Sequence, residues 1–174
     1  MFDIGDTIVH SRYGAGKVIG EKVVSLNGEE RSYICIELTG DRGTLMVQPE
    51  EVDPDEVRET LDDLNIIREV FNTTPQKLSD QHRSRQPRLQ AKIRSNDPKK
   101  VAEALRDLIW RERIDRLTET DKRIMNNARR KLMQELKISP QVNAANRKLN
   151  KIVEDAIEKH LKAAGLYEEE EGEE

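Results

Sequence analysis

The sequence lacks the features that mark secreted and membrane proteins. Its single cysteine, Cys35, has no partner for an internal disulfide. It has no apolar signal-peptide segment and no apolar run long enough to cross a membrane, so we expect a cytoplasmic protein. Cys35 lies in an alternating apolar pattern, which favours a packed sheet residue over a nucleophile.

The residue patterns of common catalytic and cofactor sites are also missing. The RYGAGK segment, residues 12–17, does not have the spacing of a phosphate-binding loop, and no helical pattern follows it. His10 and His160 have no cysteine or histidine at metal-ligand spacing, so we expect both to be structural or surface residues. The acids of the N-terminal part show no paired-carboxylate spacing. These absences predict a protein that is not an enzyme and that uses no metal or other cofactor.

Charge is divided unevenly along the chain, which has 174 residues and a formal net charge of −4 at pH 7. Residues 1–76 carry 7 basic and 16 acidic side chains, whereas residues 77–167 carry 23 basic and 12 acidic ones. Six glutamates follow in residues 168–174. Because salt confines the influence of an exposed charge to about 10 Å, the charge of a segment matters more than the total. The middle of the chain is therefore a candidate polyanion-binding region.

The first 60 residues have the pattern of short strands and tight turns. Asn27-Gly28 is the pair favoured in a type I′ hairpin turn, because both central positions need positive φ. Pro49 ends a strand because it removes a donor from the ladder. The strand-like runs are residues 7–10, 17–26, 31–38 and 44–48 and a last piece near Val57. Five short strands of this kind suggest a small SH3-like or Tudor-like barrel.

The rest of the chain has the pattern of helices. Apolar residues recur at helical spacing in residues 61–72, and residues 72–78 form a candidate linker. Asp97-Pro98 and Thr118-x-x-Asp121 are signals for the start of a helix, the second resembling a capping box. Ser139-Pro140 repeats the first signal and is predicted to open a last helix that ends at Gly165. Short connections between these helices indicate a bundle.

The most basic stretch of the chain is residues 77–94, with six basic side chains and a histidine against one acid, Asp80. Pro87 disfavours helical dihedrals in the residue before it, so we predict that a helix begins at Pro87 and runs to about Ser95. His82 to Arg85 would then lie in a loop or turn at the helix N-terminus, where backbone amides favour a phosphate.

These patterns together predict an α+β protein, in which a five-stranded barrel precedes an all-α helical bundle. The predicted divisions are a Tudor-like barrel at residues 1–60, a helix and linker at 61–78, a helical DNA-binding domain at 79–166 and an acidic disordered tail at 167–174. The last helix has near-heptad spacing, which leaves a dimer contact open. Packing within its own bundle is favoured, so we expect a monomer.

Two motifs in this order resemble the CarD/CdnL family of bacterial transcription regulators. FDIGDTIVHSRYGAGKV is similar to the family's opening segment, and KVAEALRDLIWRERIDRLTETDKRIMNNARRKLMQEL is similar to its helical signature. The resemblance covers residues 1–138. It implies a non-enzymatic regulator whose barrel docks on the β subunit of RNA polymerase through an exposed strand edge. The helical domain would then contact promoter DNA at the upstream edge of the melted bubble and stabilise the open complex.

Candidate DNA contacts come from the basic stretch and from this resemblance. Arg85 and Lys122 match basic positions of the family, and Lys122 and Arg123 are placed on the same face by that alignment. His82 occupies the position of a family tryptophan that wedges into the minor groove, where a histidine offers less apolar area. Trp110 falls within a helix and is expected to pack rather than to replace it. The predicted DNA-binding residues are His82, Arg83, Arg85, Arg88, Lys92, Arg94, Lys122 and Arg123.

Candidate polymerase contacts lie on the edge of the predicted barrel. Val24 and Val47 align with positions where family members carry arginines, so docking here would depend more on backbone pairing and apolar contact. The predicted polymerase-binding residues are Val24, Met46, Val47 and Gln48.

Two functions of different kinds fit these observations. The first is a transcription initiation regulator that bridges RNA polymerase and promoter DNA at the nucleoid. The alternative is an architectural DNA-binding protein that acts independently of polymerase and uses the basic helices alone. A solvated charged surface is the usual role of basic side chains in a chain with this many charges. DNA contact is favoured over that role for Arg85 and Lys122, and for the other basic residues both interpretations stay open.

Overall fold

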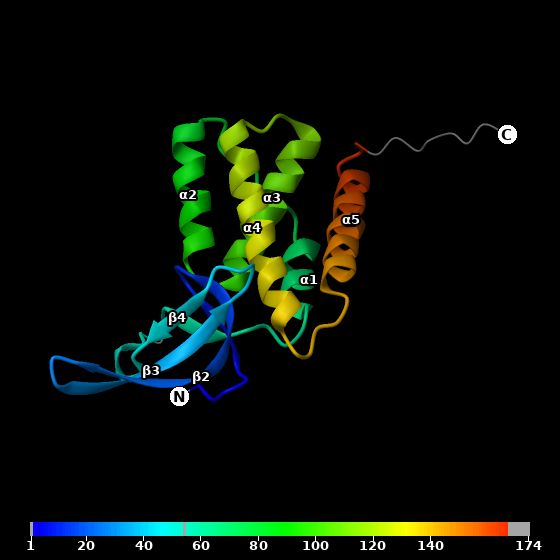
Figure 1. Ribbon diagram of the computed structural model, residues 1–174. Helices are drawn as coiled ribbons and strands as arrows, with labels where there is room; N and C mark the ends of the chain where they lie inside the picture. Colours follow the sequence, from blue (N-terminus) through cyan, green and yellow to red (C-terminus); the bar gives the residue numbers. More distant parts are fainter. Residues whose placement is uncertain (1, 54, 167–174) are drawn as a thin grey trace.

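The computed structural model describes residues 2–53 and 55–166, and the chain forms a sheet followed by a group of helices (Figure 1). Five strands make one antiparallel sheet, and five α-helices come after them in the chain. The helices stand side by side above the sheet in the view of Figure 1. The predicted α+β class is confirmed. The predicted acidic tail, residues 167–174, lies outside the described residues.

The sheet is open rather than closed into a barrel. Its strands lie in the order β4-β3-β2-β1-β5, and no ladder joins β4 to β5 within the described residues. β4 and β5 are therefore edge strands, which offer unpaired backbone groups. The strands are β1 (Thr7–His10), β2 (Gly14–Leu26), β3 (Glu29–Leu38), β4 (Thr44–Val47) and β5 (Val57–Glu59).

The hairpin of β2 and β3 extends well past its neighbours. Asn27 and Gly28 have φ of 53° and 83°, which confirms the predicted turn with two left-handed residues. β1 pairs with β2 only as far as Lys17, and β4 pairs with β3 only from Ile34 onward. The end of the hairpin is thus a two-stranded arm that projects from the sheet (Figure 1).

A small apolar core lies on one face of the sheet and explains a glycine of the RYGAGK segment. Ile8, Val18, Ile34, Ile36 and Val57 are buried together there. A Cβ at Gly16 would lie 2.7 Å from Ile36 Cγ2 and 2.8 Å from the carbonyl oxygen of Glu37. Gly16 is therefore required by close packing between β2 and β3.

The helices share a second and larger core, to which each of them contributes buried side chains. The first helix belongs to this core and not to the sheet, because Ile67, Val70 and Phe71 are buried in it. None of the helices in the described ranges is long and apolar enough to cross a membrane. The helices are α1 (Asn65–Asn72), α2 (His82–Arg94), α3 (Pro98–Ile114), α4 (Glu119–Ile138) and α5 (Ala145–Ala163).

Of the three helix starts predicted after the basic stretch, two are confirmed and one is wrong. The Asp97 side chain caps α3, and Thr118 and Asp121 form a reciprocal capping box at α4. Ser139 instead follows the end of α4, and α5 begins only after Ala144, which has φ of 49°. At the other end of α5, Gly165 has φ of 68° and donates to Lys162, as predicted for a C-terminal cap.

The predicted start of the basic helix at Pro87 is wrong. α2 begins at His82, so Pro87 lies beyond the first turn and removes one backbone hydrogen bond from it. Side-chain contacts to the turn before the proline offset that loss. The Arg85 guanidinium binds Asp121 on α4, and the Gln86 amide donates to Thr118 and Asp121. A partner far away in the sequence thus overrides a local signal.

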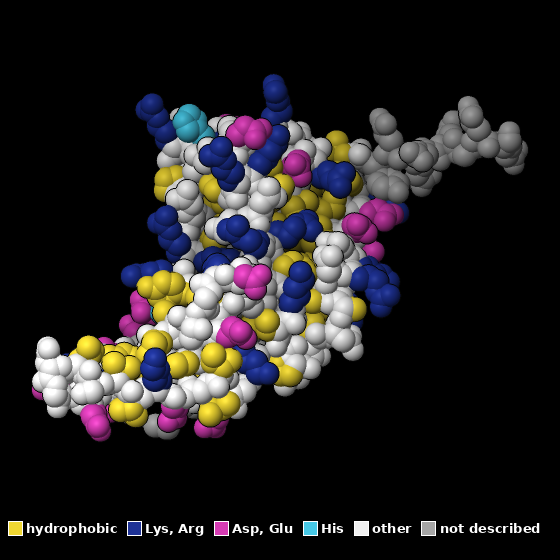
Figure 2. Space-filling model, in the orientation of Figure 1, with side chains coloured by type: hydrophobic (Ala, Val, Ile, Leu, Met, Phe, Trp, Pro, Cys, Tyr) yellow, Lys and Arg dark blue, Asp and Glu magenta, His cyan; other side chains and the backbone are white. Residues whose placement is uncertain are grey.

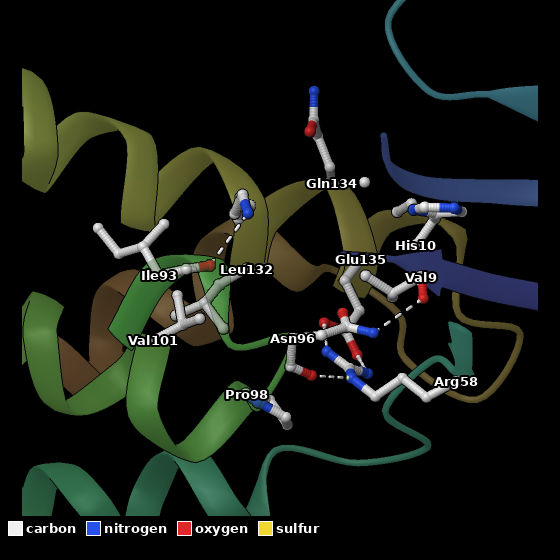
Figure 3. A pocket seen from close by; sticks show the side chains of 13 residues that line it. Val9, His10, Arg58, Ile93, Asn96, Pro98, Val101, Leu132, Gln134 and Glu135 are labelled. Carbon is white, nitrogen blue, oxygen red and sulfur yellow. Dashed lines mark hydrogen bonds and ion pairs between the residues drawn. The ribbon is translucent and has the colours of Figure 1, made fainter. Parts of the chain in front are cut away.

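The sheet and the helices are joined by a small polar cluster, which we call the joint: Arg58, Asn96 and Glu135. Arg58 Nη1 and Nη2 lie 2.6 and 2.8 Å from Glu135 Oε1 and Oε2, and Arg58 Nε lies 2.6 Å from the Asn96 carbonyl oxygen. The Asn96 amide donates to backbone carbonyls of β1 and of the turn before β5. Figure 3 shows the three side chains turned toward one another. The joint therefore fixes the sheet against α4 and the α2–α3 turn.

Candidate nucleic-acid interface

The interface is built on α2 and α4, whose N-terminal ends are held together by a buried ion pair. Arg85 Nη2 lies 2.6 Å from Asp121 Oδ2, and Arg85 Nε lies 3.2 Å from Oδ1. Arg85 Nη1 also donates to the carbonyls of Ser79 and Asp80. The pair therefore fixes the start of α2, the loop before it and the start of α4 relative to one another.

The electrostatics of this pair match its geometry. Burial of Asp121 works most strongly against its charged form, but the hydrogen bonds it accepts outweigh that effect. They come from Arg85, Thr118 and Gln86, and they hold the pKa of Asp121 well below the ordinary value of a carboxyl group. Asp121 is thus ionised at neutral pH, and the interior contains a full carboxylate and a full guanidinium.

The prediction that Arg85 contacts a DNA phosphate is wrong. The residue is 4% exposed, and its donors are engaged by Asp121 and by two backbone carbonyls. A phosphate would have to displace a buried carboxylate to reach it. Arg85 is therefore a positioning residue for the interface.

The other predicted DNA-binding residues lie at the surface, but not on one face. His82 is exposed at the first position of α2, and Arg83, Arg88 and Arg94 are exposed along it. Lys92 lies on the side of α2 that faces α3, with Nζ 3.0 Å from Glu103 Oε2. Arg88, one helical turn earlier, shares that side.

The N-terminal end of α4 carries two predicted contacts that point in different directions. Lys122 forms an exposed ion pair with Glu119, its Nζ 3.0 Å from Oε1. Arg123, the next residue, is 100° further around the helix and faces α2. Within the described residues, no carboxylate pairs with Arg83, Arg88, Arg94 or Arg123. These four arginines are available to an anion without the loss of an existing partner.

Arg94 and Arg123 meet in a groove between the two helices. The groove has a volume of about 290 Å³, and we call it the α2–α4 groove. Its walls are polar or basic at the rim and apolar at the floor, where Ile93 and Ile124 belong to the helical core. The polar and basic lining residues are Gln90, Arg94, Thr120, Arg123, Asn127 and Lys131.

Figure 2 shows how this surface is charged. Lys and Arg side chains gather over the region of α2 and α4, while acidic side chains are more frequent around the sheet. Clusters of like charge raise the local potential and attract ions of the opposite sign. The groove therefore lies within a surface suited to a polyanion.

Three groups that line or flank this surface were not among the predicted contacts. Arg130 and Lys131 follow one and two positions after Arg129 in α4, and a run of three basic residues was the available signal. Asn127 is uncharged, so the sequence gave no signal for it. Arg12 and Arg42 of the sheet lie near them, and nothing in their acidic surroundings in the sequence marked them.

Trp110 packs as predicted, and of the two roles left open for His10 and His160, structural or surface, the structure shows the first. Trp110 is half-buried against the helical core, with its ring 6.3 Å from that of His160 in an edge-to-face arrangement. His160 is buried, and its Nε2 lies 2.9 Å from the carbonyl oxygen of Phe71. His10 is buried beside Tyr13, and burial lowers its pKa. Within the described part of the chain, no three His, Cys, Asp or Glu side chains are grouped so as to hold a metal ion.

The predicted polymerase-binding residues lie on β4, beside it and on the arm. Met46 is exposed on β4, which is an edge strand. Val47 packs on the sheet core, so only its backbone faces the edge. The Gln48 side chain donates to Glu51, and Val24 lies half-buried on β2 in the projecting arm. These positions present a free strand edge with one exposed apolar side chain.

Comparison with known proteins matches both parts of the chain. The CarD-like/TRCF RID domain matches residues 2–59, which hold the sheet. The C-terminal domain of CarD matches residues 66–153, half of the chain, which hold most of the helices. YdeB of Bacillus subtilis (strain 168), whose name describes it as a candidate transcription factor, is 25% identical over 141 residues. That alignment covers 79% of this chain and 92% of the relative.

Proposed function

This chain belongs to the CarD family of transcription regulators, and from that premise we propose that it bridges RNA polymerase and promoter DNA during initiation. In this proposal the edge of the sheet binds the polymerase β subunit, and the basic surface of α2 and α4 binds DNA near the upstream edge of the bubble. The bound protein stabilises the open complex. It carries out no chemistry of its own and acts as a monomer at the nucleoid.

The observation that carries the DNA part is the α2–α4 groove. Two arginines that pair with no carboxylate of the described residues, Arg94 and Arg123, line it from opposite helices. The buried pair of Arg85 and Asp121 fixes the two helices, so little ordering is needed when a phosphate binds. Arg83 adds an exposed charge at the open N-terminal end of α2, where the helix dipole also favours an anion.

The observation that carries the polymerase part is the free edge of β4. An edge strand gains affinity by pairing its backbone with an added strand, and exposed side chains on it give specificity. Met46, at 38% exposure, is the apolar side chain available there. The joint holds this edge and the groove in one fixed relation, as a protein that bridges two partners requires.

The polymerase part is tested by a pull-down with the full chain. We expect the wild-type chain to retain RNA polymerase, and Met46→Glu to reduce retention at least several-fold because it places a charge on the pairing edge. Ile114→Glu is the matched control, since Ile114 is an exposed apolar residue at the end of α3. If the wild-type chain binds DNA but retains no polymerase, the architectural alternative replaces this proposal. Open-complex lifetime on a defined promoter, with and without the protein, then measures the outcome of bridging.

The DNA part is tested by the salt dependence of binding. Replacing Arg123 with glutamine should remove one phosphate contact and lower the slope of log K against log salt concentration by about one unit. Fluorescence anisotropy with a promoter duplex measures this slope. Arg147→Gln is the control, since Arg147 is exposed on α5, away from the groove. An equal change in both variants would mean that the groove has no special role.

A further inference from the structure

A second basic depression lies where the helices meet the sheet. It has a volume of about 520 Å³, and we call it the interdomain cleft. The sheet contributes Arg12 and Arg42 to it, and the helices contribute Arg94, Arg130 and Lys131. Glu56 is the one acidic residue among those that line it. Among the described residues, five cations thus share one cleft with a single carboxylate.

Among the described residues, these cations have no charged partners of their own. Within the ranges that the structure describes, none of the five forms an ion pair with a carboxylate. Burial lowers the pKa of Lys131 below its ordinary value, and repulsion from three nearby guanidinium groups lowers it further. Those groups belong to Arg94, Arg130 and Arg42. An anion in the cleft would relieve this repulsion.

The cationic side chains are held in place by the fold. Lys131 Nζ lies 3.0 Å from the Ile93 carbonyl oxygen and 3.5 Å from that of Ser11, so it touches helix and sheet at once. Arg42 Nε donates to the Thr39 carbonyl at 3.0 Å. On the helical side, Arg130 Nη2 donates to Asn127 Oδ1 at 2.9 Å. These contacts reduce the ordering that an anion must impose.

Arg12 is placed by the turn between β1 and β2. Its backbone N–H donates to His10 Nδ1 at 3.1 Å, and His10 packs edge-to-face on Tyr13. His10 accepts this hydrogen bond through Nδ1, and burial lowers the pKa of its ring, which favours the neutral form that can accept. The turn is thus fixed by a buried residue, and the exposed Arg12 side chain is carried to the cleft.

The interdomain cleft continues into the α2–α4 groove. Arg94, Asn127 and Lys131 line both depressions. A path of positive charge therefore runs from Arg123, through the shared residues, to Arg12 and Arg42 on the sheet. Its length favours an extended anion over a compact one. No aromatic side chain lines the cleft in the described residues, so nothing there would stack on a base or a nucleoside.

We propose that the interdomain cleft binds backbone phosphates of the same DNA that lies in the α2–α4 groove, so that the sheet contributes Arg12 and Arg42 to DNA binding. This inference rests on the proposed DNA-binding function and extends it to a part of the chain that is acidic as a whole. Phosphate contacts of this kind set register and orientation and carry no base specificity. The DNA therefore runs toward the sheet and passes beside the joint.

The test compares Arg12→Gln/Arg42→Gln with the wild-type full chain in anisotropy titrations over a range of salt concentrations. The double variant should lower the salt slope by about two units and weaken binding equally for all DNA sequences. Lys22→Gln/Arg31→Gln is the matched control, because it removes two exposed cations from the arm of the same sheet. The control should leave the slope within about half a unit of the wild-type value. Thermal melting of each variant verifies that it is folded.

Three other outcomes are decisive. If the wild-type chain binds DNA and the double variant keeps its slope, the cleft inference is overturned while the groove proposal stands. If the wild-type chain binds no DNA, the proposed function fails first. If inorganic tripolyphosphate binds the wild-type chain and not the double variant, while both variants keep the wild-type DNA slope, the cleft serves a free polyphosphate, and our assignment to DNA is wrong.

Discussion

Replacing Arg85 with methionine is expected to lower the free energy of unfolding by about 3–5 kcal/mol. The change leaves the Asp121 carboxylate fully buried without its guanidinium partner. It also removes the hydrogen bonds that fix the loop before α2. The backbone hydrogen bond that Pro87 removes from the start of α2 is then no longer offset by contacts of Arg85. Equilibrium denaturation in urea, followed by circular dichroism, measures the loss.

A double-mutant cycle separates this cause from a simple packing defect. Asp121→Asn removes the charge but keeps an oxygen that can accept from the backbone N–H and the hydroxyl of Thr118 in the capping box. If the unpaired carboxylate causes the loss, Arg85→Met/Asp121→Asn should be more stable than Arg85→Met alone. Simple addition of the two losses would mean that the ion pair contributes little. Arg88→Met serves as a control, since Arg88 is an exposed arginine of the same helix, and it should cost less than about 0.5 kcal/mol.

The same variant decides what Arg85 does in DNA binding. Because its guanidinium lies inside the protein, the folded fraction of Arg85→Met should keep the wild-type salt slope even where its affinity falls. A slope lower by about one unit in a variant of unchanged stability would restore Arg85 as a phosphate contact.

Local rules were sufficient where a structure depends on adjacent residues. The Asn27-Gly28 turn, the Asp97 cap and the capping box of Thr118 and Asp121 each involve four residues or fewer, and each was predicted correctly. The apolar periodicity likewise placed most of the helical core. Such features carry their cause within the segment itself, so one sequence reveals them.

One long-range partner explains the two errors in the basic stretch. Pro87 predicted the wrong start for α2 because the stabilising residue, Asp121, lies 36 positions from Arg85. The same pair turned Arg85 from a predicted surface contact into a buried residue. A basic side chain in a basic stretch looks alike in sequence whether its partner is a phosphate or a distant carboxylate, and only the fold separates the two.

The site was predictable in its position on the helices but not in its extent. The exposed arginines of α2 and Arg123 of α4 were among the predicted contacts, since segment charge indicates them directly, whereas the exposed Arg130 of α4 was not. Arg12 and Arg42 were not, because the net charge of residues 1–76 is negative and dilutes two local cations. Their contribution depends on how the sheet is set against α4, which is a property of the joint.

Breaking the joint should cause the second large loss of stability. Replacing Arg58 with methionine leaves Glu135, which is 2% exposed, without its guanidinium partner, and a loss of about 3 kcal/mol in the free energy of unfolding is expected. Glu135 keeps one hydrogen bond, from the Leu61 backbone N–H at 2.8 Å. Arg58→Lys is the matched control, because it keeps a charge but loses the bidentate geometry. Its free energy of unfolding should lie between those of the wild-type chain and Arg58→Met.

The loss should be unevenly distributed over the chain. The single tryptophan, Trp110, lies in the helical core, so its fluorescence follows the helices. Amide hydrogen exchange follows the sheet, which should lose protection in Arg58→Met at denaturant concentrations where Trp110 still reports folded helices. Coincident loss of both signals in Arg58→Met would mean that sheet and helices still unfold as one unit without the joint. The coupling between them would then come from other contacts.

Breaking the joint should also affect only part of DNA binding, because the joint holds the sheet and the helices in a fixed relation. In Arg58→Met the α2–α4 groove stays intact, so DNA binding persists, but the contribution of Arg12 and Arg42 needs the sheet in its fixed position. The salt slope should therefore fall by about two units, and adding Arg12→Gln/Arg42→Gln should change it no further. A further fall of about two units in the combined variant would show that the sheet reaches DNA without the joint, and the fixed orientation would then have no part in DNA binding.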